Sequence, residues 1–173
     1  MTKLARRTGF KIRCPSQGHV GSTPTFPTIT RELLEKHKGR AEYGYSCMYI
    51  PLNENFGVKM FRSRKERDAA RKYQKLGHKH DIGPAVYQNV RIFHGIPSKF
   101  TVKKIYKWGY VTQVAIINNL VSHHSKEYNA LAEKLRELGL SAGDLHSYNV
   151  GRINGKLVCI DFDSMSMNCI DET

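Results

Sequence analysis

Two short motifs near the C-terminus constrain this chain more than any other feature of its sequence. One is Gly-Asp-Leu-His-Ser-Tyr-Asn at residues 143–149, and the other is Ile-Asp-Phe-Asp at residues 160–163. An Asn-Gly pair between two short apolar runs predicts a tight β-hairpin that joins the motifs. Because a hairpin returns the chain to its starting point, the side chains of Asp144, Asn149 and Asp161 are expected to converge in space.

Carboxylate and amide oxygens brought together in this way suit phosphoryl transfer. Mg²⁺ takes oxygen ligands from one or two side chains, keeps several waters and is completed by substrate phosphates. We therefore expect Asn149 and Asp161 to bind the metal ion. Asp163 is expected to be either a further metal ligand or a helix cap. Asp144 would then orient and deprotonate an attacking hydroxyl, a role whose loss typically costs about 10²–10⁴ in rate.

The charge of the chain is large and unevenly distributed. Its 173 residues have a formal net charge of +13. No acidic residue precedes Glu32 and none lies between Asp81 and Glu127, whereas the last thirty residues contain five. A basic body with a local acidic cluster fits a site that binds a cation and a polyanion together. The field of such a protein would attract ATP, nucleic acid or an acidic protein partner.

Cysteine usage and hydropathy indicate a cytoplasmic protein. The four cysteines are scattered and form no CxxC pair, as expected for reduced thiols. No apolar run follows the basic N-terminus, so a secretory signal is not expected, and no apolar stretch approaches the length that spans a membrane. The small size, the basic charge and the lack of a targeting signal favour a viral or phage-encoded effector that acts in a host cytoplasm.

The chain divides into an arm and two lobes of one α+β fold. Residues 1–28 are basic and then rich in Thr, Pro, Ser and Gly, which predicts a flexible arm. We expect residues 29–117 to form an N-terminal lobe around an antiparallel sheet, and residues 118–173 to form a smaller lobe with a helix and the hairpin. Periodicity and turn signals predict helices at 31–38, 63–76 and 128–138 and strands at 43–49, 56–61, 85–93, 102–107, 110–117, 150–153 and 156–160.

A lysine in the second predicted strand differs from the apolar residues around it. Alternation along residues 56–61 directs Lys59 away from the apolar side chains on either side of it. In the following helix, Glu66 completes a capping-box sequence with Ser63 and also falls on the inward-facing stripe. A carboxylate that points inward at the start of a helix needs a partner, unless it only serves the cap.

The two C-terminal motifs and the lysine strand resemble the protein-kinase-like superfamily, in particular its aminoglycoside- and small-molecule-kinase branch. That branch carries a Gly-Asp-Leu-His-x-x-Asn catalytic loop followed by Ile-Asp-Phe-Asp, and the resemblance extends over roughly residues 39–163. It implies binding of ATP and Mg²⁺. The implied residues are the base Asp144, the phosphate ligand Lys59, the metal ligands Asn149, Asp161 and Asp163, the phosphate-covering glycines Gly39 and Gly44, and the adenine-contacting backbone of Val114 and Ala115. The resemblance also implies that Glu66 pairs with Lys59, unless it serves the cap alone, and Gln74 is the alternative partner.

The same resemblance predicts an unusually small member of that superfamily. Only ten residues follow Asp163, which leaves no room for an activation segment or for the helices that complete a C-terminal lobe. Ala142 also stands where the family usually has histidine. We expect a minimal protein-kinase-like fold, with an antiparallel N-lobe sheet, one helix packed on it, and a truncated C-lobe of a helix and a hairpin.

The sequence leaves three functions open. The first is an ATP- and Mg²⁺-dependent protein Ser/Thr kinase that could also phosphorylate itself. The second is an inactive pseudokinase that inhibits or recruits an acidic partner, which the missing helices favour. The third is a nucleic-acid-binding protein, which the net charge favours although no zinc-finger, RNA-recognition or helix-turn-helix pattern is present. The phosphate acceptor, and whether an oligomer completes its binding platform, also stay open.

Overall fold

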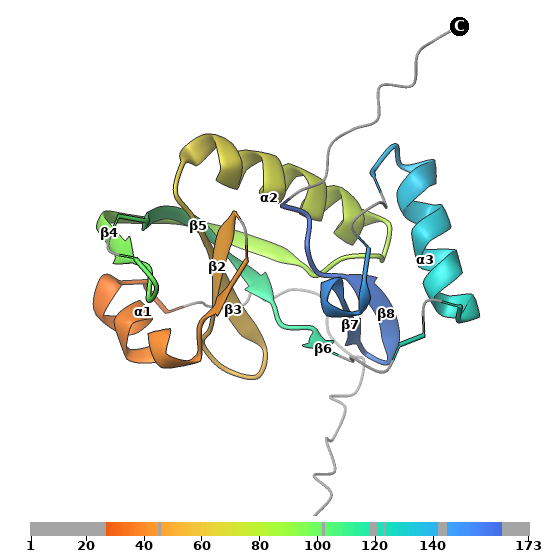
Figure 1. Cartoon of the computed structure of the whole chain (residues 1–173), viewed down its shortest axis with the longest axis horizontal. Coiled ribbons are helices and arrows are strands. Elements are labelled where there is room, and N and C mark those ends of the chain that lie inside the picture. The colour runs from red at the N-terminus through yellow and green to blue at the C-terminus, as the bar shows by residue number, and fades with distance from the viewer. Residues whose placement is uncertain are drawn as a thin grey trace, which may run out of the picture.

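The computed structural model describes residues 27–44, 46–101, 103–117, 121–122, 124–141 and 145–163, and this part of the chain forms three α-helices and two antiparallel sheets (Figure 1). Nearly all of the arm predicted at residues 1–28 lies outside the described residues. None of the three α-helices is long and apolar enough to cross a bilayer. The elements in chain order are α1 (Arg31–His37), a 3-10 helix (Lys38–Arg40), β1 (Glu42–Tyr43), β2 (Cys47–Pro51), β3 (Phe56–Phe61), α2 (Arg64–Lys79), β4 (Val86–Pro97), β5 (Ile105–Gln113), β6 (Ile116–Ile117), α3 (Lys126–Glu137), a second 3-10 helix (Ser147–Asn149), β7 (Val150–Ile153) and β8 (Lys156–Cys159).

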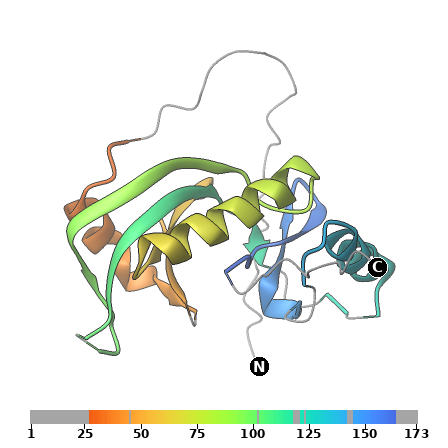
Figure 2. The same cartoon turned by 90° about the horizontal axis from the view of Figure 1, so that it is seen from above.

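The larger sheet has the strand order β1-β2-β3-β5-β4 and is antiparallel throughout. α1 covers one face, where Leu34 packs in an apolar cluster with Val58. α2 runs along the opposite face (Figure 2), where Ala70 packs with Phe61. Because side chains alternate along β3, Lys59 lies on the α2 side of the sheet, as the sequence predicts.

The smaller sheet has the strand order β6-β7-β8, and α3 packs on β8. The Asn154-Gly155 turn between β7 and β8 has both residues at positive φ, +51° and +81°, which is the geometry that favours this dipeptide. Side chains of α3 and of the hairpin, among them Leu131, Leu135 and Val150, form a core of their own. The helix and the hairpin predicted in this region are confirmed.

The segment after β8 joins the two sheets. The Cys159 amide donates to the carbonyl of Ile82 at 2.9 Å, and Phe162 is fully buried. A Cβ atom on Gly77 would lie 2.5 Å from ring carbon Cζ of Phe162, and one on Gly83 would lie 2.9 Å from it. Both glycines therefore make room for the ring, which holds the hairpin against the C-terminal end of α2.

Two glycines that the sequence predicts as breaks lie inside regular elements. α2 continues beyond Gly77 to Lys79, and the missing side chain at Gly77 leaves room for the Phe162 ring. β5 is one continuous strand, whereas the sequence predicts two strands that separate near Gly109. A Cβ atom on Gly109 would lie 2.5 Å from the carbonyl oxygen of Lys59. At both positions the absent side chain permits close packing and does not reverse the chain.

The strand predicted at residues 43–49 is divided by a turn. The Gly44 amide donates to the Cys47 carbonyl at 2.9 Å, and Tyr43 pairs with Met48 across β1 and β2. Each half is extended, so alternating aromatic residues mimic one strand in the sequence. The turn brings the backbone at Gly44 over the α2 face of the sheet, next to the site described below.

Candidate functional site

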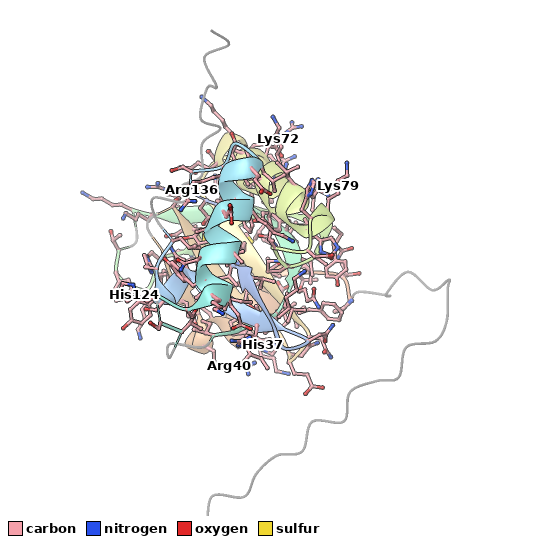
Figure 3. All side chains as sticks on the ribbon, turned by 90° about the vertical axis from the view of Figure 1, so that its right-hand side faces the viewer. His37, Arg40, Lys72, Lys79, His124 and Arg136 are labelled. Atoms are coloured by element: carbon pink, nitrogen blue, oxygen red, sulfur yellow. The ribbon has the colours of Figure 1, made fainter. Side chains whose placement is uncertain are left out.

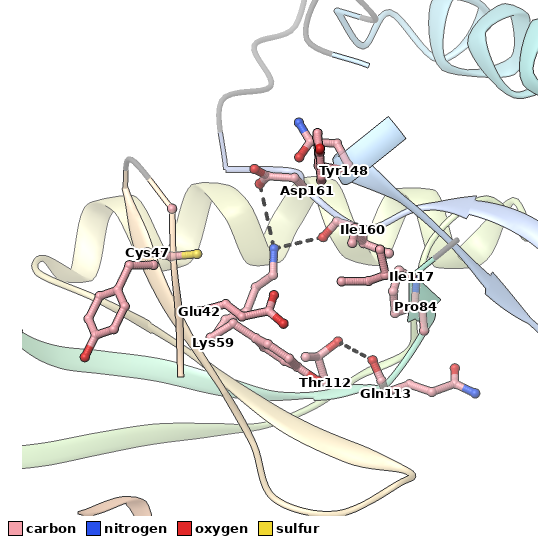
Figure 4. Close-up of a pocket in the computed structure, with 15 residues that line it drawn as sticks. Glu42, Cys47, Lys59, Pro84, Thr112, Gln113, Ile117, Tyr148, Ile160 and Asp161 are labelled. Atoms are coloured by element: carbon pink, nitrogen blue, oxygen red, sulfur yellow. Dashed lines mark hydrogen bonds and ion pairs between the residues drawn. The ribbon is translucent and has the colours of Figure 1, made fainter. Parts of the chain in front are cut away.

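The candidate site is built around Lys59, whose ammonium group connects the larger sheet to the segment after β8. Its Nζ atom donates to the Ile160 carbonyl at 2.9 Å and to Oδ1 of Asp163 at 3.2 Å. Oδ1 of Asp161 lies 3.8 Å from the same nitrogen (Figure 4). A cation carried by β3 thus meets three oxygens of the Ile-Asp-Phe-Asp motif, although about a hundred residues separate them in the sequence.

Burial and neighbouring charges act in opposite directions on Lys59. Removal from water works to lower the pKa of the ammonium group. The carboxylates, above all that of Asp163, work to raise it and prevail, so the pKa of Lys59 lies well above its usual value and the side chain stays cationic. Burial raises the pKa of Asp163, and attraction by Lys59 offsets part of this rise. The two residues form a buried ion pair in which each charge depends on the other.

The motif at residues 160–163 directs successive side chains to different neighbours. Asp161 is 32% exposed at its side chain, and its Oδ1 accepts the amide N–H of Asp163 at 2.9 Å. Phe162 enters the core. Asp163 is only 3% exposed at its side chain and faces Lys59. Asp161 is therefore the carboxylate that can meet a ligand, and Asp163 is the carboxylate that holds the lysine.

Glu66 is engaged at the start of α2. Its carboxylate accepts the Ser63 amide N–H at 3.0 Å, and the Ser63 hydroxyl accepts the Glu66 amide N–H at 3.2 Å, which completes the predicted capping box. The carboxylate also pairs with Arg62 at 3.2 Å. Among the bonds described for Glu66, none reaches Lys59. The reason is local, since a glutamate in the first turn can satisfy free backbone amides there.

Gln74, the alternative partner, belongs to a separate buried network. Its Nε2 atom donates to Oγ1 of Thr112 at 2.6 Å, and its Oε1 atom accepts the hydroxyl of Tyr110 at 2.9 Å. These bonds tie α2 to β5 and satisfy the polar atoms of a fully buried amide. In the described residues the partner of Lys59 is therefore Asp163, and α2 supplies none.

A cavity of about 210 Å³ opens beside Lys59, between the larger sheet and the C-terminal hairpin. Figure 4 shows the side chains that line it, with Lys59 and Asp161 on facing elements. Five residues predicted for the site take part in its walls: Gly44, Lys59, Ala115, Asn149 and Asp161. These five residues come from the β1–β2 turn, β3, the β5–β6 connection and both C-terminal motifs, so the fold gathers what the sequence separates.

The other predicted ligand contacts lie outside this wall. The Val114 amide donates to the carbonyl of Asn55 at 2.9 Å, so the loop between β2 and β3 already occupies it. Gly39 lies in the first 3-10 helix with open space around it. Asp163, predicted as a further metal ligand or a cap, faces Lys59 instead.

Backbone hydrogen bonds hold Asn149 in place at the end of the second 3-10 helix. Its amide donates to the carbonyl of His146 at 2.8 Å, and its carbonyl accepts the amide of Ile160 at 2.9 Å. The second bond joins the two predicted motifs directly. It places Asn149 beside the residue that precedes Asp161, in the same wall of the cavity.

The predicted catalytic base, Asp144, lies outside the described residues, as do Ala142 and Gly143. The described residues begin again at Leu145. There His146 caps the second 3-10 helix, with Nδ1 at 3.3 Å from the Tyr148 amide. This contact orders the backbone directly before Asn149.

The donors at the cavity fit Mg²⁺ and a nucleotide phosphate. Asp161 offers a partly exposed carboxylate and Asn149 an amide, which are oxygen donors that Mg²⁺ accepts. The Lys59 cation lies 3.8 Å from that carboxylate, so a phosphate could meet positive charge next to the metal position. Within the described ranges no group of three or more His, Cys, Asp or Glu side chains is arranged to hold a metal ion. Of the oxygen donors that line the cavity, Asn149 and Asp161 are the ones that the sequence predicts, and Glu42 adds a further carboxylate.

The sequence did not point to Cys47 or Tyr148. Cys47 is 7% exposed, shares a hydrogen bond with Asp163, and has a thiol pKa that burial raises well above its usual value. Alternation along β2 could have placed it on the Lys59 side of the sheet. Tyr148 is 68% exposed at the cavity, directly before Asn149. Its position inside the first motif was the available signal.

Comparison with models of protein families and with curated protein sequences gives no significant match to this chain.

Proposed function

We propose that this chain is an ATP- and Mg²⁺-dependent phosphotransferase of protein-kinase-like fold, which transfers a phosphoryl group to a Ser or Thr hydroxyl of a protein. The observation that carries the proposal is the 3.8 Å approach of Lys59 and Asp161 in the wall of a cavity that Asn149 also lines. A cation, a carboxylate and an amide at one cavity are the groups that phosphoryl transfer uses. The antiparallel sheet, with α2 on one face and the hairpin beyond it, supports the kinase-like fold.

Each residue has a defined task in this proposal. Lys59 holds the α- and β-phosphates, and Asn149 and Asp161 hold Mg²⁺, which when bound neutralises charge that develops on the phosphate oxygens. Gly44 lets the backbone of the β1–β2 turn approach the phosphates. Asp144 accepts the proton of the attacking hydroxyl at its carboxylate. The acceptor oxygen forms a bond to the γ-phosphorus, the bond to the bridging oxygen breaks, and ADP leaves.

Asp163 serves as the positioning residue for Lys59 in this proposal. An ammonium group has three N–H donors, and the bonds to Ile160 and Asp163 use two of them. The third donor is available to a phosphate that enters from the cavity. Asp163 thus takes the place that a helix glutamate has in the superfamily, since Glu66 serves the cap of α2.

A protein acceptor is favoured by the rim of the cavity. Tyr148 and Ile117 line the cavity and are 68% and 40% exposed, and the neighbouring Ile116 is 62% exposed. An exposed apolar rim around a polar site suits contact with another protein. A copy of the same chain would satisfy this requirement as well as a foreign substrate, which leaves autophosphorylation within the proposal.

The direct test is transfer of label from γ-labelled ATP. The purified chain is incubated with Mg²⁺ and dephosphorylated casein, and mass spectrometry locates the label on casein or on the chain itself. We expect Asp144→Asn to lower the rate by at least about 10²-fold. Asp68→Asn removes an exposed carboxylate of α2 and is the matched control. Equal labelling by wild type and Asp144→Asn would contradict the proposal.

Nucleotide binding without transfer is the second candidate, and the enclosure of Lys59 favours it. Its side chain is 10% exposed and already bonded to two oxygens. A thermal scan with ATP, with and without Mg²⁺, separates the candidates. Ligand at about 100 times its dissociation constant should stabilise the fold by about 2.7 kcal/mol. Stabilisation without any labelling supports the second candidate, and no stabilisation under either condition contradicts both.

A further inference from the structure

The outer half of the β4–β5 hairpin carries large apolar side chains that the fold leaves in water. Phe93 on β4 is 77% exposed, and Phe100 in the connecting loop is 76% exposed. The ring of Phe93 contacts His94, and the ring of Phe100 contacts Tyr43, in both cases edge to face. At these exposures each phenylalanine ring keeps an open face.

The same hairpin is basic along its length. The sequence from Asp81 to Glu127 contains no acidic residue between these two positions. No salt bridge of the described residues involves the exposed cations of the hairpin. Within the described part of the chain, no acidic side chain pairs with them to compensate their positive charge. These cations are Arg91, Lys99, Lys103, Lys104 and Lys107.

Aromatic residues and cations lie close together along the sequence of this hairpin. Lys99 directly precedes Phe100, and Arg91 lies two positions before Phe93. The Arg91 guanidinium group lies 4.7 Å from the ring centroid of Trp108, its partner across β4 and β5. A surface that alternates an aromatic ring with a cation matches a polymer that alternates an aromatic base with a phosphate.

The hairpin is placed to act separately from the cavity. It extends to the end of the molecule opposite α3 (Figures 1 and 2). The Lys99 amide donates to the hydroxyl of Tyr43 at 3.1 Å, so the tip is fixed to β1 and presents its rings in a defined arrangement. Tyr43 also lines the cavity, whereas Phe93 and the hairpin cations are not among its lining residues.

We propose that the outer half of the β4–β5 hairpin binds single-stranded nucleic acid, with Phe93 and Phe100 stacking on bases and the hairpin cations contacting phosphates. A single strand fits better than a duplex, because its bases are free to stack on the rings. An acidic protein would match the charge but has no regular use for the rings. A membrane surface would require the apolar groups to gather at one tip, whereas Phe93 lies within a strand.

α2 is the reference surface for this proposal. Figure 3 shows Lys72 and Lys79 of α2 at the molecular surface, and Lys75 is exposed as well. The large exposed apolar residues of the described chain lie elsewhere than on α2. α2 therefore offers cations without stacking platforms, and the hairpin offers both.

The test titrates the full-length chain against a fluorescein-labelled oligothymidylate and follows fluorescence anisotropy at about 50 and about 200 mM salt. Phe93→Ala combined with Phe100→Ala should weaken binding by at least about 10-fold, since each stacked base is worth a factor of about 5 to 150, with an unchanged salt slope. Phe93→Tyr with Phe100→Tyr keeps the rings and should keep the affinity. Unfolding midpoints verify that these exposed substitutions leave the fold intact.

Two matched lysine variants distinguish the hairpin from charge in general. Lys99→Gln, Lys103→Gln and Lys104→Gln together should reduce the slope of log affinity against log salt by about 2. Lys72→Gln, Lys75→Gln and Lys79→Gln remove the same charge from α2 and should change the slope little. Equal effects of the two triple variants, or unchanged affinity without the rings, would overturn the proposal. The proposal would also be overturned if the chain did not bind the oligonucleotide but bound anionic phospholipid vesicles or polyglutamate through the hairpin.

Discussion

The charges at the cavity and the charges on the β4–β5 hairpin differ in whether the protein compensates them. At the cavity Lys59 is buried among the oxygens of residues 160–163. On the hairpin the cations are exposed and take part in no described salt bridge. Buried and compensated charges fix a geometry, because removal of one strands the other in a poor solvent for ions. Exposed and uncompensated charges fix little structure, but their field reaches roughly 8–10 Å into the solvent.

Breaking the buried pair is expected to have the largest effect on stability. Lys59→Met leaves the carboxylate of Asp163 buried without its cation, which should lower the free energy of unfolding by roughly 3–5 kcal/mol. Adding Asp163→Asn to Lys59→Met removes the stranded charge and should restore part of the loss. Urea unfolding of the two single variants, the double variant and wild type measures the coupling. If the two single losses simply add, the pair has no such role.

The loss in Lys59→Met should also depend on pH. Burial raises the pKa of Asp163 in the native state, and without Lys59 the rise is larger. The native carboxyl then holds a proton at pH values where the unfolded one, with a pKa of about 3.9, has lost it. The variant is therefore relatively most stable below that pKa and loses stability as the pH rises through the raised native pKa. Lys107→Met on the hairpin is the control, for which no such pH dependence is expected.

Gly77 is expected to show the next largest effect. Alanine in place of glycine within a helix is normally favourable by roughly 0.5–1 kcal/mol. Here the added Cβ would lie 2.5 Å from the Phe162 ring, so Gly77→Ala should lower the free energy of unfolding by about 1–3 kcal/mol. Gly39→Ala has no atom within 4 Å of its new Cβ and is the matched control. An unchanged or raised unfolding midpoint for Gly77→Ala would show that Phe162 does not lock α2.

Glu66 and Asp163 separate helix stability from nucleotide binding. Glu66→Ala removes half of the capping box and should lower the free energy of unfolding by about 1 kcal/mol, while the affinity for ATP stays unchanged. Asp163→Asn should weaken the binding of ATP, because Lys59 loses its positioning residue. The binding of adenosine should stay unchanged, because adenosine has no phosphate for Lys59 to contact. Isothermal titration with both ligands measures this. A weaker ATP affinity in Glu66→Ala would return the pairing role to α2.

The smallest stability effect is expected on the hairpin. Lys103→Gln and Lys104→Gln lie at exposed positions without described ion pairs and should change the free energy of unfolding by no more than about 0.5 kcal/mol. Thermal unfolding at low and high salt provides the measurement. A large change would mean that the hairpin cations support the fold, and the contrast with the cavity would be lost.

The approach of Asn149 and Asp161 could be predicted because it follows from local signals, whereas Asp144, the third side chain of that prediction, lies outside the described residues. The Asn154-Gly155 turn sets the hairpin, and alternation sets the side of β3 on which Lys59 lies. The partner of Lys59 could not be predicted, since it depends on how tightly the segment after β8 docks on α2. That docking uses Gly77 as a packing position, whereas its local meaning in the sequence is a helix end. Local propensity predicts a helix end at this glycine, whereas tertiary packing requires a residue without a side chain inside the helix. Only the three-dimensional arrangement distinguishes the two.

The packing of residues 160–163 makes this segment sensitive to length as well as to composition. The side chain of Asp161 is partly exposed, that of Phe162 lies in the core, and that of Asp163 faces Lys59. The direction of each side chain is therefore set by its position in the segment. An extra residue just before Asp161 would move every later side chain to its neighbour's direction, and a carboxylate would enter the slot between Gly77 and Gly83. Conservative replacements within the segment should therefore be tolerated far better than an insertion or a deletion.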